Sequence, residues 1–160
     1  MKSSKKRKIL IAGAGLIGST MALALASEGF DITVVDGTTA KHRINRNKGR
    51  TYALSRTSKN LLTNLGLWDA KRLNACPIEN ILLSTKRSDT KRHLMEFKRE
   101  SSDLGPSSYM IEDFYLRRVL EAELIKNSKI QLINALEVIK DETSYFESKV
   151  MLSDKSLFNT

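Results

Sequence analysis

Residues 9–36 read ILIAGAGLIGSTMALALASEGFDITVVD, and this stretch decides the fold class. Its first four residues are apolar and rich in β-forming side chains, which is typical of a buried parallel strand. The glycine pattern G-x-G-x-x-G follows, and the largely uncharged stretch after it predicts a helix that ends near Gly29. Residues 31–35 predict a second buried strand, which is followed by Asp36. The order strand, glycine turn, helix, strand and acid predicts a Rossmann-like βαβ unit in an α/β fold.

The glycine pattern also indicates a function, because each glycine has a physical role. Gly13 lets the chain turn tightly out of the strand, Gly15 lets a pyrophosphate approach the backbone, and Gly18 lets helix and strand pack closely. The helix N-terminus offers unpaired N–H groups and the positive end of its dipole to the phosphates. The predicted pyrophosphate-binding residues are Gly13, Ala14, Gly15, Leu16, Ile17 and Gly18.

Asp36, at the tip of the second strand, is predicted to accept hydrogen bonds from a ribose hydroxyl and to repel a 2′-phosphate. The motif by itself leaves two dinucleotides open, FAD and NAD.

Composition excludes several other classes of protein. The chain has 160 residues, of which 41% are hydrophobic, so it is long and apolar enough for one globular domain. One cysteine and two histidines leave no disulfide framework and no predicted metal ligands. The formal charge is +9, but the basic residues lie in separate segments and aromatic residues make up only 6%. Without basic and aromatic residues interleaved, a nucleic-acid partner is not predicted.

Residues 1–26 imitate a secretory signal or a membrane span, because a basic start precedes a long uncharged run. The spaced glycines in that run and the strand after it favour a cytosolic fold element instead.

The second half of the chain predicts further elements. A polar, basic loop is expected over residues 40–50, and a helix over residues 57–66. Leucines spaced by four predict a helix over residues 113–126. Strands are expected over residues 78–85, 93–98, 130–134, 138–139 and 149–152.

Three blocks of the sequence together resemble one family. They are residues 9–36, residues 50–69 with the stretch Arg50-Thr-Tyr-Ala-Leu-Ser55, and residues 109–120, which start Tyr109-Met-Ile-Glu112. Their order and spacing are similar to those of the ubiquinone-biosynthesis hydroxylases of the UbiH/UbiF/Coq6 type. Those proteins are FAD-dependent aromatic-ring hydroxylases with the para-hydroxybenzoate hydroxylase fold.

The resemblance implies roles for individual residues. The glycines would hold the FAD pyrophosphate, and Asp36 stands where the family has an acid that binds the adenosine ribose. Arg50 matches an arginine that lies along the flavin and its phosphates, and Arg117 matches a position near the FAD phosphates. The resemblance implies no acid, base or nucleophile from this chain, because the flavin carries the chemistry.

The resemblance also predicts an organisation: a basic N-terminal arm (residues 1–8), an FAD-binding domain (residues 9–152) with a β excursion (residues 76–110), and a tail (residues 153–160). The family's later Gly-Asp motif and substrate domain have no counterpart here, so the expectation is an N-terminal fragment that binds the ADP half of FAD.

The resemblance further implies NAD(P)H as reductant, a polyprenylated aromatic substrate, and a complementing chain or other ubiquinone-synthesis proteins as partners. The expected location is cytoplasmic, with at most peripheral contact at the inner membrane. Two alternatives stay open: an NAD-binding Rossmann module of a dehydrogenase, and a non-catalytic truncated remnant.

Overall fold

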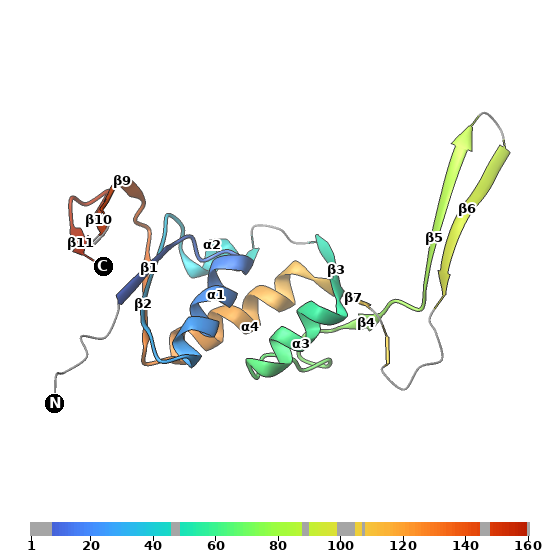
Figure 1. Cartoon of the computed structure of the whole chain (residues 1–160), viewed down its shortest axis with the longest axis horizontal. Coiled ribbons are helices and arrows are strands. Elements are labelled where there is room, and N and C mark those ends of the chain that lie inside the picture. Colours follow the sequence, from blue (N-terminus) through green and yellow to red (C-terminus); the bar gives the residue numbers. More distant parts are fainter. Residues whose placement is uncertain are drawn as a thin grey trace. The chain divides into compact units, whose positions relative to one another are not determined.

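The structure is a computed structural model, and it describes residues 8–45, 49–87, 90–98, 105–106, 108–144 and 148–159. The chain divides into two compact units (Figure 1). Unit 1 comprises Met1–Arg50 and Asp113–Thr160, and unit 2 comprises Thr51–Glu112. Most of the predicted N-terminal arm lies outside the described residues, and Lys8 already begins the first strand.

Unit 1 contains the predicted βαβ unit. Strand β1 (Lys8–Ala12) pairs in parallel with β2 (Asp31–Asp36), and helix α1 (Leu16–Ser27) connects them. Strand β8 (Ile130–Asn134) pairs in parallel with β2 on its other side, so the sheet order is β1-β2-β8. The α/β fold class with a parallel sheet is therefore confirmed.

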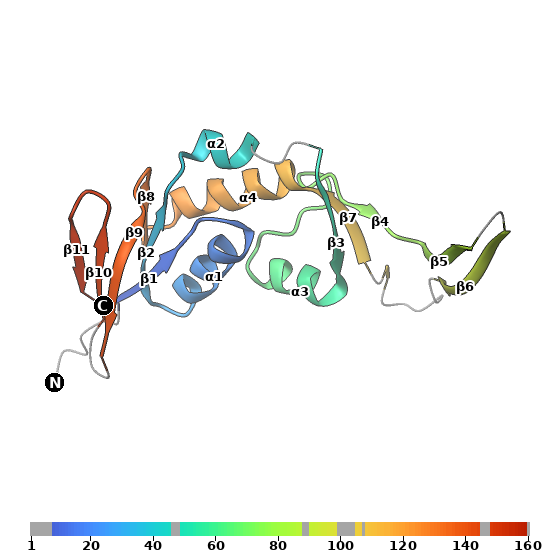
Figure 2. The same cartoon turned by 90° about the horizontal axis from the view of Figure 1, so that it is seen from above.

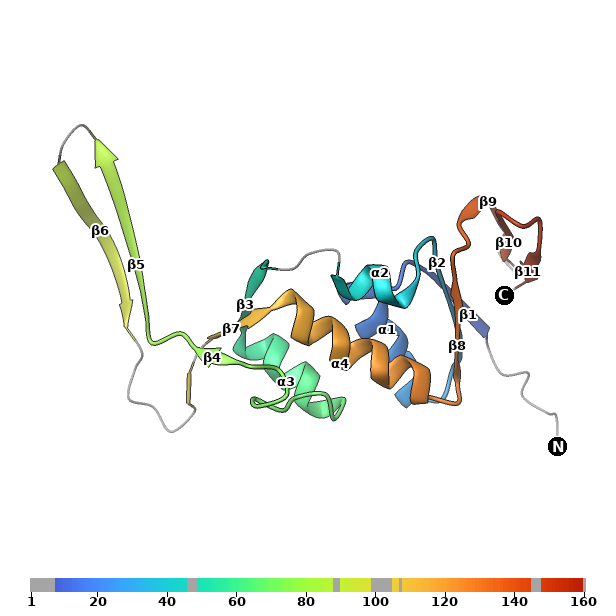
Figure 3. The same ribbon diagram turned by 180° about the vertical axis from the view of Figure 1, so that it is seen from behind.

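Helices cover one face of this parallel sheet (Figure 3). Helix α4 (Asp113–Lys126) packs against α1 and β8, and the short helix α2 (Ala40–Asn45) packs against α4. The predicted stripe on α4 is buried, with Leu116, Leu120 and Leu124 at most 5% exposed. Burial of this apolar stripe stabilises the layer through the hydrophobic effect.

An antiparallel sheet covers the other face of the parallel sheet (Figure 2). Strands β9 (Val138–Thr143), β10 (Ser148–Leu152) and β11 (Leu157–Asn159) pair in the order β11-β10-β9. A cluster of buried residues joins the two sheets, made of Val35, Val150 and Leu152 with partly buried neighbours such as Leu10 and Ile133. Unit 1 therefore has three layers, and the carboxyl ends of its parallel strands point to the glycine turn.

Unit 2 is built from antiparallel strands and one helix. Strands β3 (Thr51–Ser55), β7 (Ser108–Glu112) and β4 (Cys76–Pro77) pair in the order β3-β7-β4, and helix α3 (Arg56–Asn64) follows β3. Strands β5 (Asn80–Arg87) and β6 (Thr90–Lys98) form a separate two-stranded sheet. This hairpin exposes about half of the surface of several large apolar side chains, namely Ile81, Leu82, Leu83, Leu94, Met95 and Phe97.

The structure differs from the sequence-based expectation at residues 40–50. A loop was expected there, whereas residues 40–45 form helix α2. The segment lacks an apolar stripe that would signal a helix, and its buried residue is a charged one, Arg43. The helix therefore depends on long-range polar contacts rather than on a pattern visible in the segment itself.

In the described part of the chain, every helix falls short of the length and apolar character that a membrane crossing requires.

Candidate dinucleotide-binding site

The glycine turn between β1 and α1 has the geometry that its sequence predicts. Gly13 has a φ of +100°, a conformation that L side chains rarely adopt, and its N–H donates to the carbonyl of Val35 at 2.7 Å. A Cβ added to Gly18 would lie 1.9 Å from the carbonyl oxygen of Gly13. A Cβ added to Gly15 would meet nothing within 4 Å. Gly13 and Gly18 therefore form the turn, and Gly15 leaves open space in front of it.

Helix α1 begins at this turn and presents backbone donors. Gly15 is its N-cap, no side chain caps it, and the first helical hydrogen bond runs from the N–H of Ser19 to the carbonyl of Gly15 at 2.9 Å. Within the described residues, the amides of Leu16, Ile17 and Gly18 have no recorded acceptor, as is usual for a first helical turn. The helix N-terminus therefore offers donors and a positive dipole to an anion.

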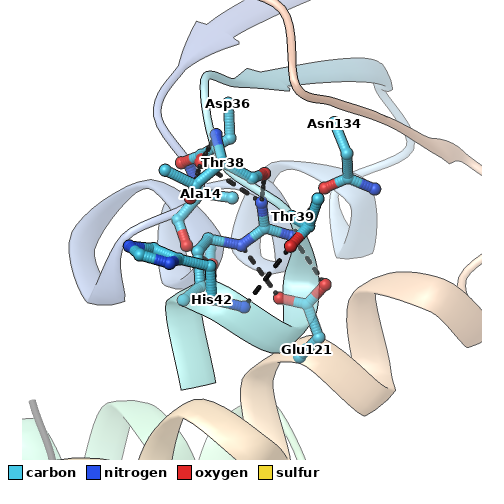
Figure 4. A network of polar contacts seen from close by, with 9 residues as sticks. Ala14, Asp36, Thr38, Thr39, His42, Glu121 and Asn134 are labelled. Atoms are coloured by element: carbon cyan, nitrogen blue, oxygen red, sulfur yellow. Dashed lines mark hydrogen bonds and ion pairs between the residues drawn. The ribbon is translucent and has the colours of Figure 1, made fainter. Parts of the chain in front are cut away.

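Asp36 lies at the end of β2 and contacts the glycine turn directly (Figure 4). Its Oδ2 accepts a hydrogen bond from the Ala14 N–H at 2.7 Å. Its Oδ1 accepts from the N–H and the hydroxyl of Thr38, at 2.8 and 2.6 Å, and lies 3.2 Å from a nitrogen of Arg43. These contacts hold the carboxylate at the edge of the turn.

The same contacts keep Asp36 ionised. Burial on its own raises the pKa of the carboxyl group, but the Thr38 side chain, the two backbone N–H donors and the Arg43 charge outweigh it. The pKa of Asp36 in the folded protein therefore lies below its ordinary value of 3.8.

This shift predicts a pH dependence of stability. Because the folded pKa is lower than the unfolded one, Asp36 adds stability above the unfolded value, and this contribution is lost as the pH falls through the folded pKa. We expect the unfolding free energy to fall less between about pH 5 and pH 3 in Asp36→Asn than in the wild type. Urea unfolding across this pH range measures the difference, and parallel declines in the two proteins contradict the prediction.

A buried arginine anchors this corner of the site. Arg43 is 4% exposed and donates from Nε and Nη2 to the two carboxylate oxygens of Glu121, at 3.2 and 2.7 Å. Its Nη2 also donates to Asn134 Oδ1 at 2.7 Å, and its Nη1 donates to the Thr38 carbonyl at 2.6 Å. The network therefore ties α2 to α4 and to the carboxyl ends of β2 and β8.

A narrow hollow lies beside the glycine turn, and Arg117 contributes to it. Its lining residues are Ala14, Gly15, Leu16, Ser19, Arg43, Arg117, Leu120 and Glu121. Arg117 Nε donates to Asp113 Oδ2 at 2.6 Å. Its two terminal nitrogens have no recorded partner among the described residues, so this guanidinium keeps donors for an anion.

Most of the predicted site residues therefore come together. Within the glycine turn, Ala14 is in direct contact with Asp36, and Arg117 lines the same hollow as Ala14, Gly15 and Leu16. Arg50 is exposed and does not line the hollow, although its carbonyl accepts from the N–H of Asp113 at 2.8 Å at the start of α4.

Sequence reasoning missed Arg43, Glu121 and Asn134, because no local pattern joins residues that are 78 and 91 positions apart. No group of three or more potential metal ligands occurs within the described ranges.

Comparisons with known proteins find one family model and two curated relatives. Residues 9–103, more than half of the chain, match the family model described as ketopantoate reductase PanE/ApbA. Ubiquinone hydroxylase UbiL of Rhodospirillum rubrum is 31% identical over 123 residues, which are 76% of this chain and 28% of that protein. The 3-demethoxyubiquinol 3-hydroxylase of Escherichia coli is 30% identical over 133 residues, 81% of this chain and 33% of that protein. The chain thus spans about a third of the length of these curated relatives.

A solved structure shows the same fold. PqsL of Pseudomonas aeruginosa, described as a probable FAD-dependent monooxygenase, superposes with a TM-score of 0.67 at 16% identity, over 94% of this chain and 39% of that one.

The fold and the glycine turn define a Rossmann-type dinucleotide-binding protein, and by the family model the chain belongs to the ketopantoate reductase PanE/ApbA family. The match to that model stops before α4, whereas an alignment over 76% of the chain necessarily includes most of this helix. On this wider comparison the chain is similar to part of two proteins, a ubiquinone hydroxylase and a 3-demethoxyubiquinol 3-hydroxylase.

Proposed function

We propose that this chain binds FAD by its ADP half and serves an FAD-dependent monooxygenase that hydroxylates an aromatic ring in ubiquinone biosynthesis. The observation that carries the proposal is the convergence of three elements on one spot. They are the open space at Gly15, the unpaired amides of α1, and the Asp36 carboxylate that contacts Ala14.

The residues of the site fit an adenosine diphosphate group. A pyrophosphate is anionic, and it would meet the first amides of α1 and the terminal nitrogens of Arg117. Asp36 would accept a ribose hydroxyl, and its low pKa keeps it an acceptor at neutral pH. The predicted set of FAD-binding residues is Gly13, Ala14, Gly15, Leu16, Ile17, Gly18, Asp36, Arg50 and Arg117.

This site needs no acid, base or nucleophile if the chemistry of the whole enzyme takes place on the flavin. The redox chemistry belongs to the cofactor, and the protein supplies binding, orientation and electrostatics. In this chain the glycine turn fixes where the pyrophosphate lies, Asp36 sets the orientation of the ribose, and Arg117 offsets phosphate charge. Arg50, which the family resemblance puts along the flavin, would act beyond this hollow.

The names of the curated relatives support the rest of the proposal. They are ubiquinone hydroxylases, which points to a prenylated aromatic substrate for the whole enzyme. NAD(P)H as reductant, a complementing chain or other ubiquinone-synthesis proteins as partners, and a cytoplasmic location with at most peripheral contact at the inner membrane complete the proposal. The NAD-binding dehydrogenase alternative has less support, because the relatives aligned through α4 are hydroxylases.

The test is a titration of the purified chain with FAD and, separately, with NADH, followed by fluorescence. The wild type is expected to bind FAD. Gly15→Val is expected to stay folded, because its side chain enters open space, and to weaken FAD binding by about 100-fold, the equivalent of two lost hydrogen bonds to a charged group.

Met21→Val is the matched control, since Met21 lies half-exposed on the same helix and away from the turn. It is expected to bind FAD as the wild type does. Binding of NADH without FAD favours the dehydrogenase alternative. A folded chain that binds neither dinucleotide contradicts the assignment, and an aggregating chain that binds neither favours the truncated remnant.

A further inference from the structure

Two arginines, Arg43 and Arg117, line the hollow beside the glycine turn. They differ in how many of their guanidinium N–H groups are engaged by other protein groups. A guanidinium has five N–H donors. Arg43 uses four in hydrogen bonds, to Thr38, Asn134 and both oxygens of Glu121. Its Nη1 also lies 3.2 Å from Asp36 Oδ1 in an ion pair. The Arg43 guanidinium is therefore engaged by neighbouring protein groups on every nitrogen, in contrast to Arg117.

The two oxygens of Asp36 are also unequal. Oδ1 has three partners, namely the N–H and hydroxyl of Thr38 and the guanidinium of Arg43. Oδ2 has one partner, the N–H of Ala14. A carboxylate oxygen accepts about two hydrogen bonds, so an acceptor position remains at Oδ2. Oδ2 is also the oxygen that accepts a hydrogen bond from the glycine turn, at the Ala14 N–H, and the dinucleotide would lie beside this turn.

Arg43 can orient Asp36 because it is itself fixed from the opposite side. Its Nε and Nη2 donate to the two carboxylate oxygens of Glu121. Two parallel hydrogen bonds of this kind constrain the plane of the guanidinium. Glu121 lies on α4, where its side chain is only 8% exposed. Figure 4 shows Asp36 and Thr38 on one side of this network and Glu121 on the other.

We propose that Arg43 and Glu121 are a positioning pair, which holds Oδ1 of Asp36 so that Oδ2 is left as the acceptor for a single ribose hydroxyl of the bound dinucleotide. This inference rests on the proposed function of the site. In this inference the effect of the pair reaches the ligand through Asp36.

The test replaces the pair by apolar residues, as Arg43→Met with Glu121→Met. Replacing both members of a buried ion pair by apolar side chains of similar volume is often neutral for folding. We expect the double variant to melt within a few degrees of the wild type and to bind FAD about 10-fold more weakly. A double replacement in an exposed pair on the same helix, Glu123→Met with Lys126→Met, is the control and is expected to bind FAD normally.

A second readout separates positioning from mere packing. Arg43 is the charged group whose field lowers the pKa of Asp36, and the other groups that do so are the uncharged Thr38 and the N–H of Ala14. Because the Thr38 and Ala14 donors stay in place, the difference is confined to acidic pH, and the double variant is expected to lose FAD affinity faster than the wild type as the pH falls from 7 to 4. The ratio of the two dissociation constants at each pH removes any titration of FAD itself.

A folded double variant that binds FAD like the wild type at both pH values overturns the inference. Should the double variant not fold, Arg43→Lys decides, because lysine keeps the charge but cannot make the fork to Glu121. Weaker FAD binding by a folded Arg43→Lys supports the pair, and unchanged binding overturns it. A wild-type chain that binds no FAD removes the proposed function as well, whereas wild-type binding with unaffected variants overturns the positioning pair alone.

Discussion

Gly18→Ala is expected to abolish stable folding of the βαβ unit. The new Cβ would lie 1.9 Å from the Gly13 carbonyl oxygen and 3.1 Å from its carbonyl carbon, and both are backbone atoms that cannot rotate away. Gly13 itself is constrained, because its N–H is bonded to Val35 and its φ of +100° suits glycine. Relief therefore requires α1 to move off the sheet, which places the loss of unfolding free energy above about 4 kcal/mol.

Circular dichroism during urea or thermal unfolding measures this effect. Gly15→Ala is the matched control, since it adds the same methyl group to the same turn in open space, at a φ of −71°. We expect the control to lose no more than about 1 kcal/mol. A Gly18→Ala protein that melts with the wild type would show that α1 and β1 are less closely packed than the structure has them.

Arg43→Met alone is expected to cost about 3–5 kcal/mol, which is the usual cost of breaking a buried ion pair from one side. The substitution leaves the Glu121 carboxylate buried without its cation and removes the donor to Asn134. The single variant should therefore be much less stable than the double variant with Glu121→Met, although the double variant carries more changes. The single variant is less stable than the double variant because it leaves the Glu121 charge without a partner. The side-chain volume removed at position 43 is the same in both variants.

Urea unfolding of the wild type and of the single and double variants measures the order of their stabilities. Lys126→Met is the control, because it removes a cation from the exposed pair with Glu123, and it should cost less than about 1 kcal/mol. Equal stability of Arg43→Met and the wild type would mean that Glu121 finds another partner or reaches solvent.

The parts of the fold that the sequence predicts are those with local signals. The strand over residues 9–12, the glycine turn and the helix with Leu116, Leu120 and Leu124 each show their own pattern, and the structure confirms them. The pairing of β3 with β7 has no such signal, because Thr51 lies opposite Glu112, far along the chain. Contacts of this kind depend on the assembled fold and leave no periodic pattern in either segment.

The site divides in the same way. The glycines and Asp36 can be predicted because the βαβ geometry specifies both their residue types and their spacing. Arg43 stands in a basic segment that looks solvated, and nothing local separates it from the neighbouring lysines and arginines. The burial of Arg43 cannot be predicted from this segment, because it depends on the ion pair with Glu121 on α4.

The β5–β6 hairpin has a consequence for handling the protein. Its two strands pair only with each other in the described structure, so each has an open edge, and its partly exposed apolar side chains lie on both faces. Isolated two-stranded hairpins are marginally stable in water, and an open apolar edge templates pairing between molecules. Colloidal stability of the isolated chain will therefore fall with concentration even while the dinucleotide-binding unit stays folded. A dilution series followed by light scattering will separate this self-association from loss of the fold.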